Sequence, residues 1–321
     1  MSDKVIYKYL SYEDALKTLE NNSVVLNNPL NYNDPFDSVI DIDEKDEEKT
    51  IQLLMEVAFV KEIAKLLNRK DIKIKWYLKP IFWFDKTMIN FILKITKKER
   101  KYTPIPTINS VINFILKLAE AQDINVAESI KELEMQFIND LLPKIKELRN
   151  KALVSCFSER NDSILMWGHY ADKHKGVCIG YKKPEQYFYD IEYSFKRVKF
   201  PLYELSCIIA SYLILDEIPV FNCEEILKKG LKPFLTKSKE WEYEKEVRCL
   251  FSLNDKKKFK NIDEGRYLYK MPSEVVEIYL GCKVTDEQKN RLLEIIKDKK
   301  VKMYQFIESK DKYELISVSC N

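Results

Sequence analysis

Glycine is the residue that most limits what this chain can fold into, because only six of its 321 residues are glycine. That is about 2%, against a usual level of about 7%. Phosphate-binding loops of the GxGxxG and GxxxxGK(S/T) types need several glycines, since the backbone turns tightly and approaches the phosphates closely. Neither pattern occurs. A nucleotide site would therefore have to be lined by side chains, and we expect it within residues 155–181, where three of the six glycines lie.

The balance of residue types fits a folded protein without a bulk affinity for nucleic acid. Apolar residues make up 45% of the chain and charged residues 33%, enough to bury a core and stay dissolved. The 54 basic and 51 acidic residues give a formal charge of +3, too small to indicate nucleic acid. The length fits one large domain or two smaller ones. Only His169 and His174 are present, which excludes a metal site with three histidine ligands.

The cysteines and the first residues favour a cytoplasmic location. Seven cysteines occur without any CxxC pair, and most have apolar neighbours, as expected of reduced and buried thiols. The first ten residues lack the basic and apolar segments of a signal peptide. The most apolar window, 76–95, carries four charged residues, so we predict a buried or interfacial helix there and no membrane span.

Residue periodicity predicts an α+β chain in which strands and helices are segregated. Apolar and alternating runs predict strands at residues 5–10, 23–26, 152–157, 176–181, 244–252, 275–280, 301–307 and 313–318. Capping residues predict helices that begin after Ser11 and Thr285, and further helices are predicted at 163–171, 202–215 and 224–229. The strands lack the regular alternation with helices that is typical of a parallel sheet.

The spacing of apolar residues in the middle of the chain predicts a separate helical part. Apolar residues recur every three or four positions between 126 and 148, as on one face of a helix. We therefore predict an α/β core domain from residues 1–45 and 151–321, with a helical insertion or subdomain at 46–150. The insertion is the part that we expect to contact a protein partner.

One segment combines two acids and a guanidinium. On a predicted strand, Glu244, Glu246 and Arg248 point to one face, because side chains alternate with a period of two. Burying these charges is costly unless they are paired. Two interpretations stay open: a solvated edge strand with an acid–arginine ladder, or a catalytic carboxylate held on rigid backbone beside a second carboxylate.

A second segment places His169 and Tyr170 within one predicted helical turn. A hydrogen-bonded packing role and a catalytic role are both open for His169. His169 and His174 are five positions apart and no cysteine has ligand spacing, so we expect no zinc site. A nucleophile pair of Cys156 with His169 is a further option, although the apolar neighbours of Cys156 predict an inert thiol.

Aromatic residues make up 12% of the chain, and several gather near its start. They either pack in the core and in loops or form a surface on which a nicotinamide or adenine ring stacks. The residues concerned are Tyr7, Tyr9, Tyr12, Tyr32 and Phe36. The asparagine, aspartate and proline content of residues 27–37 predicts a structured loop in the same part of the chain.

Several motifs together resemble a large, mostly bacterial family, domain-of-unknown-function family 2971. They are Tyr-Lys-Tyr at 7–9, Asn-Asp-Pro-Phe-Asp at 33–37, Cys-Phe-Ser at 156–158, Met-Trp-Gly-His-Tyr-Ala at 166–171, His-Lys-Gly-Val-Cys at 174–178, Trp-Glu-Tyr-Glu-Lys-Glu-Val-Arg at 241–248 and Leu-Gly-Cys at 280–282. The motifs follow the family's order over about residues 7–283. The family name assigns no activity.

The order of elements also resembles the ADP-ribosyltransferase superfamily, whose members bind NAD between two small antiparallel sheets. The resemblance implies a small, split antiparallel sheet core, here with a large helical insertion. Lys8 or Tyr9 would fill the first-strand position, which is His or Arg in that superfamily. Ser155-x-x-Ser158 with Tyr170 would fill the second position, and Glu244-x-Glu246 the third.

This resemblance implies a set of site residues. The catalytic candidates are Glu246, Glu244, Tyr170 and His169. The residues implied to bind NAD are Lys8, Tyr9, Asn33, Asp34, Ser155, Ser158 and Arg248. A carboxylate would stabilise the positive charge that develops as the C1′–nicotinamide bond breaks, and a cation such as Lys8 or Arg248 would hold the pyrophosphate.

The leading hypothesis is therefore an NAD-consuming, ADP-ribosyltransferase-like enzyme of the bacterial cytosol. NAD is its expected substrate, a macromolecule its expected acceptor, and no metal is expected. A role in antiviral defence or in a toxin system is what such families imply.

Two alternatives stay open. A metal-dependent nuclease would find oxygen or nitrogen ligands in Asp34, Asp37, Asp162, His169, Glu244 and Glu246. A non-catalytic sensor would bind a nucleotide at the sheet and signal through the helical part.

Overall fold

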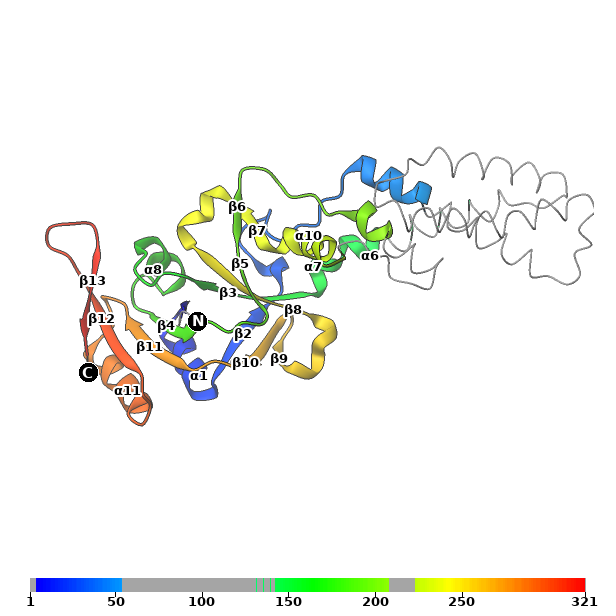
Figure 1. The fold of residues 1–321 in the computed structure, drawn as a ribbon. Coiled ribbons are helices and arrows are strands. Elements are labelled where there is room, and N and C mark those ends of the chain that lie inside the picture. The colour runs from blue at the N-terminus through cyan, green and yellow to red at the C-terminus, as the bar shows by residue number, and fades with distance from the viewer. Residues whose placement is uncertain are drawn as a thin grey trace, which may run out of the picture. The chain divides into compact units, whose positions relative to one another are not determined.

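The computed structural model describes residues 4–53, 131, 135, 139, 142–207 and 223–320 (Figure 1). The chain divides into two compact units, Met1–Ile42 with Lys144–Phe200 and Leu227–Asn321, and Asp43–Pro143 with Pro201–Ile226. Most of the predicted helical part at 46–150, including the window at 76–95, lies outside the described residues, as does the predicted 202–215 helix beyond residue 207. Within the described part of the chain, no helix has the length and apolar character needed to cross a membrane.

The first unit is a mixed α/β structure whose main sheet is mostly antiparallel. The path through the sheet runs β13–β12–β11–β4–β1–β3–β2–β10–β9, and β8 joins it by pairing with β3 and β5 (Figure 1). Its strands are β1 (Val5–Leu10), β2 (Ser23–Asn27), β3 (Ala152–Ser158), β4 (Val177–Lys182), β5 (Phe188–Asp190), β8 (Glu246–Ser252), β9 (Phe259–Asp263), β10 (Arg266–Lys270), β11 (Val275–Leu280), β12 (Lys302–Glu308) and β13 (Leu315–Ser319). A short parallel pair forms a second sheet, β6 (Glu192–Ser194) with β7 (Thr236–Ser238).

Two helices begin at the caps that the sequence predicted, and a third begins at a cap that it did not. Ser11 accepts from the backbone N–H of Asp14 at the start of α1 (Tyr12–Asn21), and Thr285 forms a capping box with Gln288 at the start of α11 (Asp286–Ile296). Helix α8 (Ile164–Tyr170) starts after Ser163 in the same way. Further described helices are α6 (Leu142–Lys146), α7 (Leu148–Lys151) and α10 (Cys223–Leu235), with 3₁₀ helices η1 (Pro29–Asn31), η3 (Lys239–Glu244) and η4 (Leu253–Lys258). Residues 44–53 and 202–207 are also helical.

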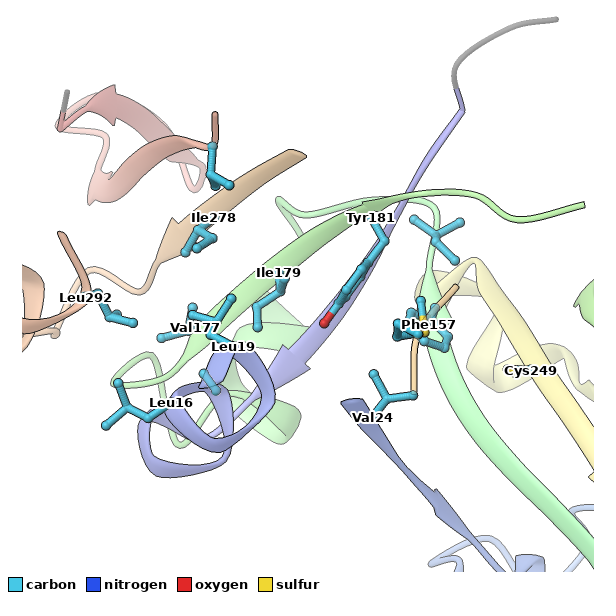
Figure 2. Packing of buried hydrophobic residues seen from close by; sticks show 14 of the residues in the cluster. Leu16, Leu19, Val24, Phe157, Val177, Ile179, Tyr181, Cys249, Ile278 and Leu292 are labelled. Atoms are coloured by element: carbon cyan, nitrogen blue, oxygen red, sulfur yellow. The ribbon is translucent and has the colours of Figure 1, made fainter. Parts of the chain in front are cut away.

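The two faces of the sheet carry different buried clusters. Val177 and Ile179 of β4 pack with Leu16 of α1 and Leu292 of α11, as Figure 2 shows. Cys178 between them points to the opposite face, as the alternation along a strand requires. That face carries the aromatic cluster, which consists of Tyr9, Met166, Trp167, Ala171, Cys178, Tyr279 and Phe306, with Tyr7, Tyr170, Tyr243, Tyr304 and Leu315 partly buried at its margin.

Strands β1 and β2 pair with different parts of β3, so the two diverge along it. Tyr7 of β1 lies opposite Ser158, whereas Asn27 of β2 lies opposite Val154 at the other end of β3. In the intervening stretch, the Lys8 ammonium donates to the carbonyl oxygen of Cys156 at 2.8 Å. Lys8 therefore supplies a hydrogen-bond donor at the point where the two strands diverge.

The strand predicted at 244–252 begins two residues later than expected. Glu244 ends η3, and Lys245 follows with a left-handed backbone, φ 43°, so that β8 starts at Glu246. The prediction that Glu244 shares a face with Glu246 and Arg248 by strand alternation is therefore wrong. The interpretation as a solvated edge strand is also wrong, because β8 lies between β3 and β5 and Arg248 is buried.

Two of the scarce glycines lie where backbones cross. A methyl group at Gly176 would lie 2.1 Å from the carbonyl oxygen of Leu10, and one at Gly281 would lie 2.1 Å from that of His174. The N–H of Gly281 donates to the Gly176 carbonyl at 3.0 Å. The segment between α8 and β4 can therefore pack against the end of β11 only because both positions lack side chains.

We predict that Gly176→Ala lowers the free energy of unfolding by about 1–3 kcal/mol or more, because the added methyl group meets backbone atoms that cannot rotate away. Gly168→Ala is the matched control, since nothing lies within 4 Å of its added methyl group and alanine favours a helix. Urea denaturation should give a lower midpoint for Gly176→Ala and an equal or higher one for Gly168→Ala. Equal midpoints for the two variants would contradict the packing explanation.

Candidate functional site

A fully buried arginine forms the centre of the candidate site. Arg248 of β8 donates to both carboxylate oxygens of Asp37, at 2.8 and 2.6 Å, and to both of Glu246, at 2.7 and 3.2 Å. It also donates to the Ser38 hydroxyl at 3.2 Å and to the carbonyl oxygen of Phe234 at 2.9 Å. Two carboxylates thus compensate one guanidinium, which is the condition under which a charge is tolerated without water.

Lys237 of β7 joins a third carboxylate to this arrangement. Its ammonium donates to Glu244 Oε2 at 2.5 Å and to Glu246 Oε2 at 3.3 Å. The ammonium also lies 4.7 Å from the centre of the Trp241 ring, a cation–π contact. One cation therefore bridges the two glutamates. We refer to Asp37, Lys237, Glu244, Glu246 and Arg248 as the charge network.

The two bridged carboxylates have pKa values that move in opposite directions. Burial opposes ionisation of Glu246, but Arg248 and Lys237 outweigh it and lower its pKa to about 2. At Glu244, burial is the larger effect and raises the pKa above 4.5, although Lys237 and Tyr170 favour the charged form. Such a pair contains one carboxylate that stays ionised and one that can exchange a proton, as in acid–base catalysis.

Side chains from three other elements position the two glutamates. The Tyr170 hydroxyl on α8 donates to Glu244 Oε1 at 2.6 Å, and Ser158 on β3 donates to the Glu244 carbonyl oxygen at 2.6 Å. The Tyr193 hydroxyl on β6 accepts from the backbone N–H of Glu246 at 2.7 Å. Burial and the bond to Glu244 both raise the pKa of Tyr170, so its hydroxyl is a proton donor at neutral pH. The structure thus brings together Glu244, Glu246, Tyr170, Ser158 and Arg248 of the predicted set.

The two cations predicted to hold a pyrophosphate are occupied by protein groups. The Lys8 ammonium donates to Ser155 Oγ at 3.0 Å and to the Cys156 carbonyl, and burial lowers the pKa of Lys8. Ser155 alternates with Cys156 and therefore points away from the face that carries Arg248. Lys8 and Ser155 thus form a contact outside the charge network, and Arg248 is bound to Asp37 and Glu246.

The remaining predicted residues also lie outside the charge network. Tyr9 is 7% exposed in the aromatic cluster, and its hydroxyl donates to the Arg160 carbonyl at 3.0 Å. His169 is an exposed residue of α8, and its ring centre lies 6.2 Å from that of Tyr170. Asp34 accepts from the N–H of Phe36 at 2.8 Å as part of a turn, and Asn33 is exposed.

Half of the ligands proposed for a nuclease, Asp37, Glu244 and Glu246, are paired with cations of the charge network. Asp37 and Glu246 bind Arg248, whereas Asp162 pairs with Arg160 at 2.7 Å. Among the described residues, no group of three or more His, Cys, Asp or Glu side chains is arranged to hold a metal ion.

Cys156 fits the inert thiol that its neighbours predicted. Burial raises the pKa of Cys156 to about 12, and the Tyr32 hydroxyl lies 3.4 Å from its sulfur. A thiol that stays protonated at neutral pH is a poor nucleophile.

Sequence reasoning missed the contributions of Asp37 and Lys237. The sequence indicates Asp37 only as part of a turn-rich loop and as a candidate metal ligand, and it lies 211 positions from its partner Arg248. Lys237 lies on a three-residue strand that no periodicity reveals. The available signal was indirect: an arginine beside Val247 and Cys249 on a buried strand requires acids to compensate it.

A family model described as "Protein of unknown function (DUF2971)" matches residues 166–249. The match confirms the resemblance to this family that the motifs indicated. The matched range contains Tyr170, Lys237, Glu244, Glu246 and Arg248, which are most of the site described above. No curated protein and no solved structure matches the chain.

Removing one carboxylate partner of the buried Arg248 should lower the stability of the fold. We predict that Asp37→Asn lowers the free energy of unfolding by about 3–5 kcal/mol, because it leaves a buried guanidinium with one carboxylate. Asp162→Asn removes an exposed partner of Arg160 and should cost about 1 kcal/mol or less. Both are measured by urea denaturation, and similar losses in the two variants would refute the central place of Arg248.

The lowered pKa of Glu246 predicts an acid-dependent loss of stability. A carboxylate whose folded-state pKa is depressed stabilises the fold above its ordinary pKa of 4.5, and this contribution is lost as pH falls towards about 2. Its full size is on the order of 3 kcal/mol. The free energies of unfolding of the wild type and Glu246→Gln should therefore converge between about pH 4.5 and 2. A difference that is constant over this range would contradict the assignment.

Proposed function

We propose that this protein cleaves the C1′–nicotinamide bond of NAD and transfers the ADP-ribose moiety to a nucleophile. The observation that carries the proposal is the pair Glu244 and Glu246, which share Lys237 yet have pKa values displaced in opposite directions. Cleavage of a glycosidic bond uses two carboxylates with separate roles, and the opposite pKa shifts suit these two glutamates to different roles.

Each glutamate has a distinct task in this proposal. The C1′–nitrogen bond breaks with its electron pair going to nicotinamide, which leaves as a neutral molecule, so no acid is needed for the leaving group. Positive charge then develops on the ribose ring, and the ionised Glu246 stabilises it. The nucleophile forms a bond to C1′ and gives its proton to Glu244, whose raised pKa suits it to act as a base.

The fixed positions of the two glutamate side chains support these catalytic roles. Glu246 is held by Arg248, Lys237 and the hydroxyl of Tyr193, and Glu244 by Lys237 and Tyr170. Fixed dipoles and charges need no reorganisation when charge develops in the substrate, which is the main source of electrostatic catalysis. The nucleophile is either water or a group on a macromolecular acceptor.

One observation favours a second candidate, a nucleotide-binding module without catalysis. Glu246 is 4% exposed, and both of its carboxylate oxygens accept from Arg248. This pairing is typical of a structural ion pair, in which the carboxylate fixes the packing of the protein and takes no part in a reaction. In this case the protein binds NAD or a related nucleotide and leaves it intact.

Single substitutions of the two glutamates test the enzymatic proposal. Glu244→Gln and Glu246→Gln should each lower kcat for nicotinamide release from NAD by about 100-fold or more, because each removes a charge or a base used in the transition state. Glu242→Gln is the matched control, since Glu242 is partly exposed and pairs with Lys239. Chromatography of released nicotinamide gives the rates, and circular dichroism verifies folding.

The pH dependence of the wild-type rate provides a second readout in the same experiment. The rate should rise as pH increases through a pKa above 4.5, because Glu244 accepts a proton only in its ionised form. Equal turnover in all three variants would exclude the glutamate mechanism. NAD binding without turnover by the wild type would instead support the non-catalytic module.

A further inference from the structure

A row of side chains crosses the sheet from the charge network to a second carboxylate. In the strand register, Glu246 of β8 lies opposite Ser158 of β3, and Ser158 lies opposite Tyr7 of β1. Tyr7 lies opposite Gly180 of β4, which in turn lies opposite Glu277 of β11. Residues directly opposite one another point to the same face of a sheet. Glu246 and Glu277 therefore lie at the two ends of one row of side chains, on the face that carries the aromatic cluster.

Gly180 allows Tyr7 and Glu277, the residues on either side of it in this row, to interact. A methyl group there would lie 2.7 Å from Cγ of Glu277 and 3.1 Å from Cε1 of Tyr7. Without it, the Tyr7 side chain reaches across β4 and its hydroxyl donates to Glu277 Oε1 at 2.6 Å. The tyrosine and the carboxylate thus come from strands that are not neighbours, and the missing side chain of Gly180 joins them.

The Tyr7–Glu277 pair repeats the chemistry of the Tyr170–Glu244 pair. In both, a tyrosine hydroxyl donates to a glutamate oxygen at 2.6 Å. Tyr279 lies two residues further along β11, and burial together with the charge of Glu277 raises the pKa of Tyr279. Tyr7 and Glu277 are both half-buried, so a ligand can reach them. The mechanism proposed above uses neither residue.

We propose that Tyr7 and Glu277 form a binding subsite for the vicinal hydroxyls of a nucleotide ribose, on the same sheet face as the charge network. A carboxylate fixed by one tyrosine hydroxyl still has lone pairs for a sugar diol, which donates two hydrogen bonds to it. The inference deepens the proposed function, because it assigns this subsite to the adenosine ribose of NAD.

Distance supports a ligand that occupies both ends of the row. The Tyr7 and Glu277 side chains meet over Gly180 of β4, and three strand spacings, about 14 Å, separate β4 from β8 through β1 and β3. A mononucleotide is too short to span this interval, whereas an extended dinucleotide has two riboses joined by a pyrophosphate. With C1′ of the nicotinamide ribose at Glu244 and Glu246, the second ribose lies towards Glu277.

The subsite also predicts discrimination between two dinucleotides. A carboxylate that accepts hydrogen bonds from the adenosine ribose repels the 2′-phosphate that NADP carries at that position. The wild type should therefore prefer NAD over NADP. Glu277→Gln removes both the charged acceptor for the diol and the repulsion of the phosphate.

Steady-state kinetics of nicotinamide release test the subsite. Glu277→Gln should raise KM for NAD by about 10- to 100-fold with little change in kcat, and should reduce the preference for NAD over NADP. Tyr7→Phe should shift KM in the same direction by a smaller factor. Tyr12→Phe is the matched control, because the Tyr12 hydroxyl bonds the Gln288 carbonyl on the other side of the sheet.

The outcomes separate this inference from the proposed function. If the wild type turns over NAD and Glu277→Gln keeps the wild-type KM and NADP preference, the subsite is refuted while the proposed function stands. A lowered melting temperature with unchanged KM likewise refutes it, since Tyr7 and Glu277 would then only join strands.

If the wild type turns over no NAD, the proposed function fails, and calorimetric titration with NAD decides the subsite. Binding by the wild type that weakens at least 10-fold in Glu277→Gln supports it. Equal binding in both proteins, or none in the wild type, overturns it.

Discussion

The buried guanidinium of Arg248 is the interaction on which the candidate site depends. It lies on β8 between two paired strands and binds Asp37 from the loop after β2 and Glu246 from its own strand. An unpaired charge at this position would be very costly, so the loop that carries Asp37 and the strand that carries Glu246 have to come together. The same contacts leave Glu246 ionised, and they place a second cation, Lys237, between it and Glu244.

The consequence is an asymmetric pair of carboxylates built on elements of different kinds. Glu246 is fixed on a strand, whereas Glu244 ends a 3₁₀ helix and is redirected by the left-handed Lys245. Burial opposes ionisation of both glutamates, but Arg248 and Lys237 together outweigh it at Glu246, whereas burial prevails at Glu244. The difference in environment, rather than in residue type, gives the two glutamates separate chemical roles in the proposed NAD cleavage.

Much of the fold was predictable because its signals are local. The caps at Ser11 and Thr285 locate two helices, and apolar runs locate β1, β3, β4 and β11. The site was only partly predictable, because its contacts join distant segments. No periodicity reveals that Asp37 meets Arg248, that Lys237 bridges two glutamates, or that Tyr7 rather than Lys8 shares a row with Ser158 and Glu246. The division into a core and a helical insertion stays a prediction, as does the resemblance to ADP-ribosyltransferases.

Titration of the individual glutamate carboxyl groups tests the central claim most directly. Carbon-13 NMR of glutamate-labelled protein, assigned with Glu244→Gln and Glu246→Gln, follows each carboxyl group through its own pKa. We predict that the Glu246 signal stays in its ionised position until the pH approaches about 2, while the Glu244 signal titrates above 4.5. Two signals that titrate together near 4.5 would contradict the asymmetric pair, and with it the division of roles between the two glutamates.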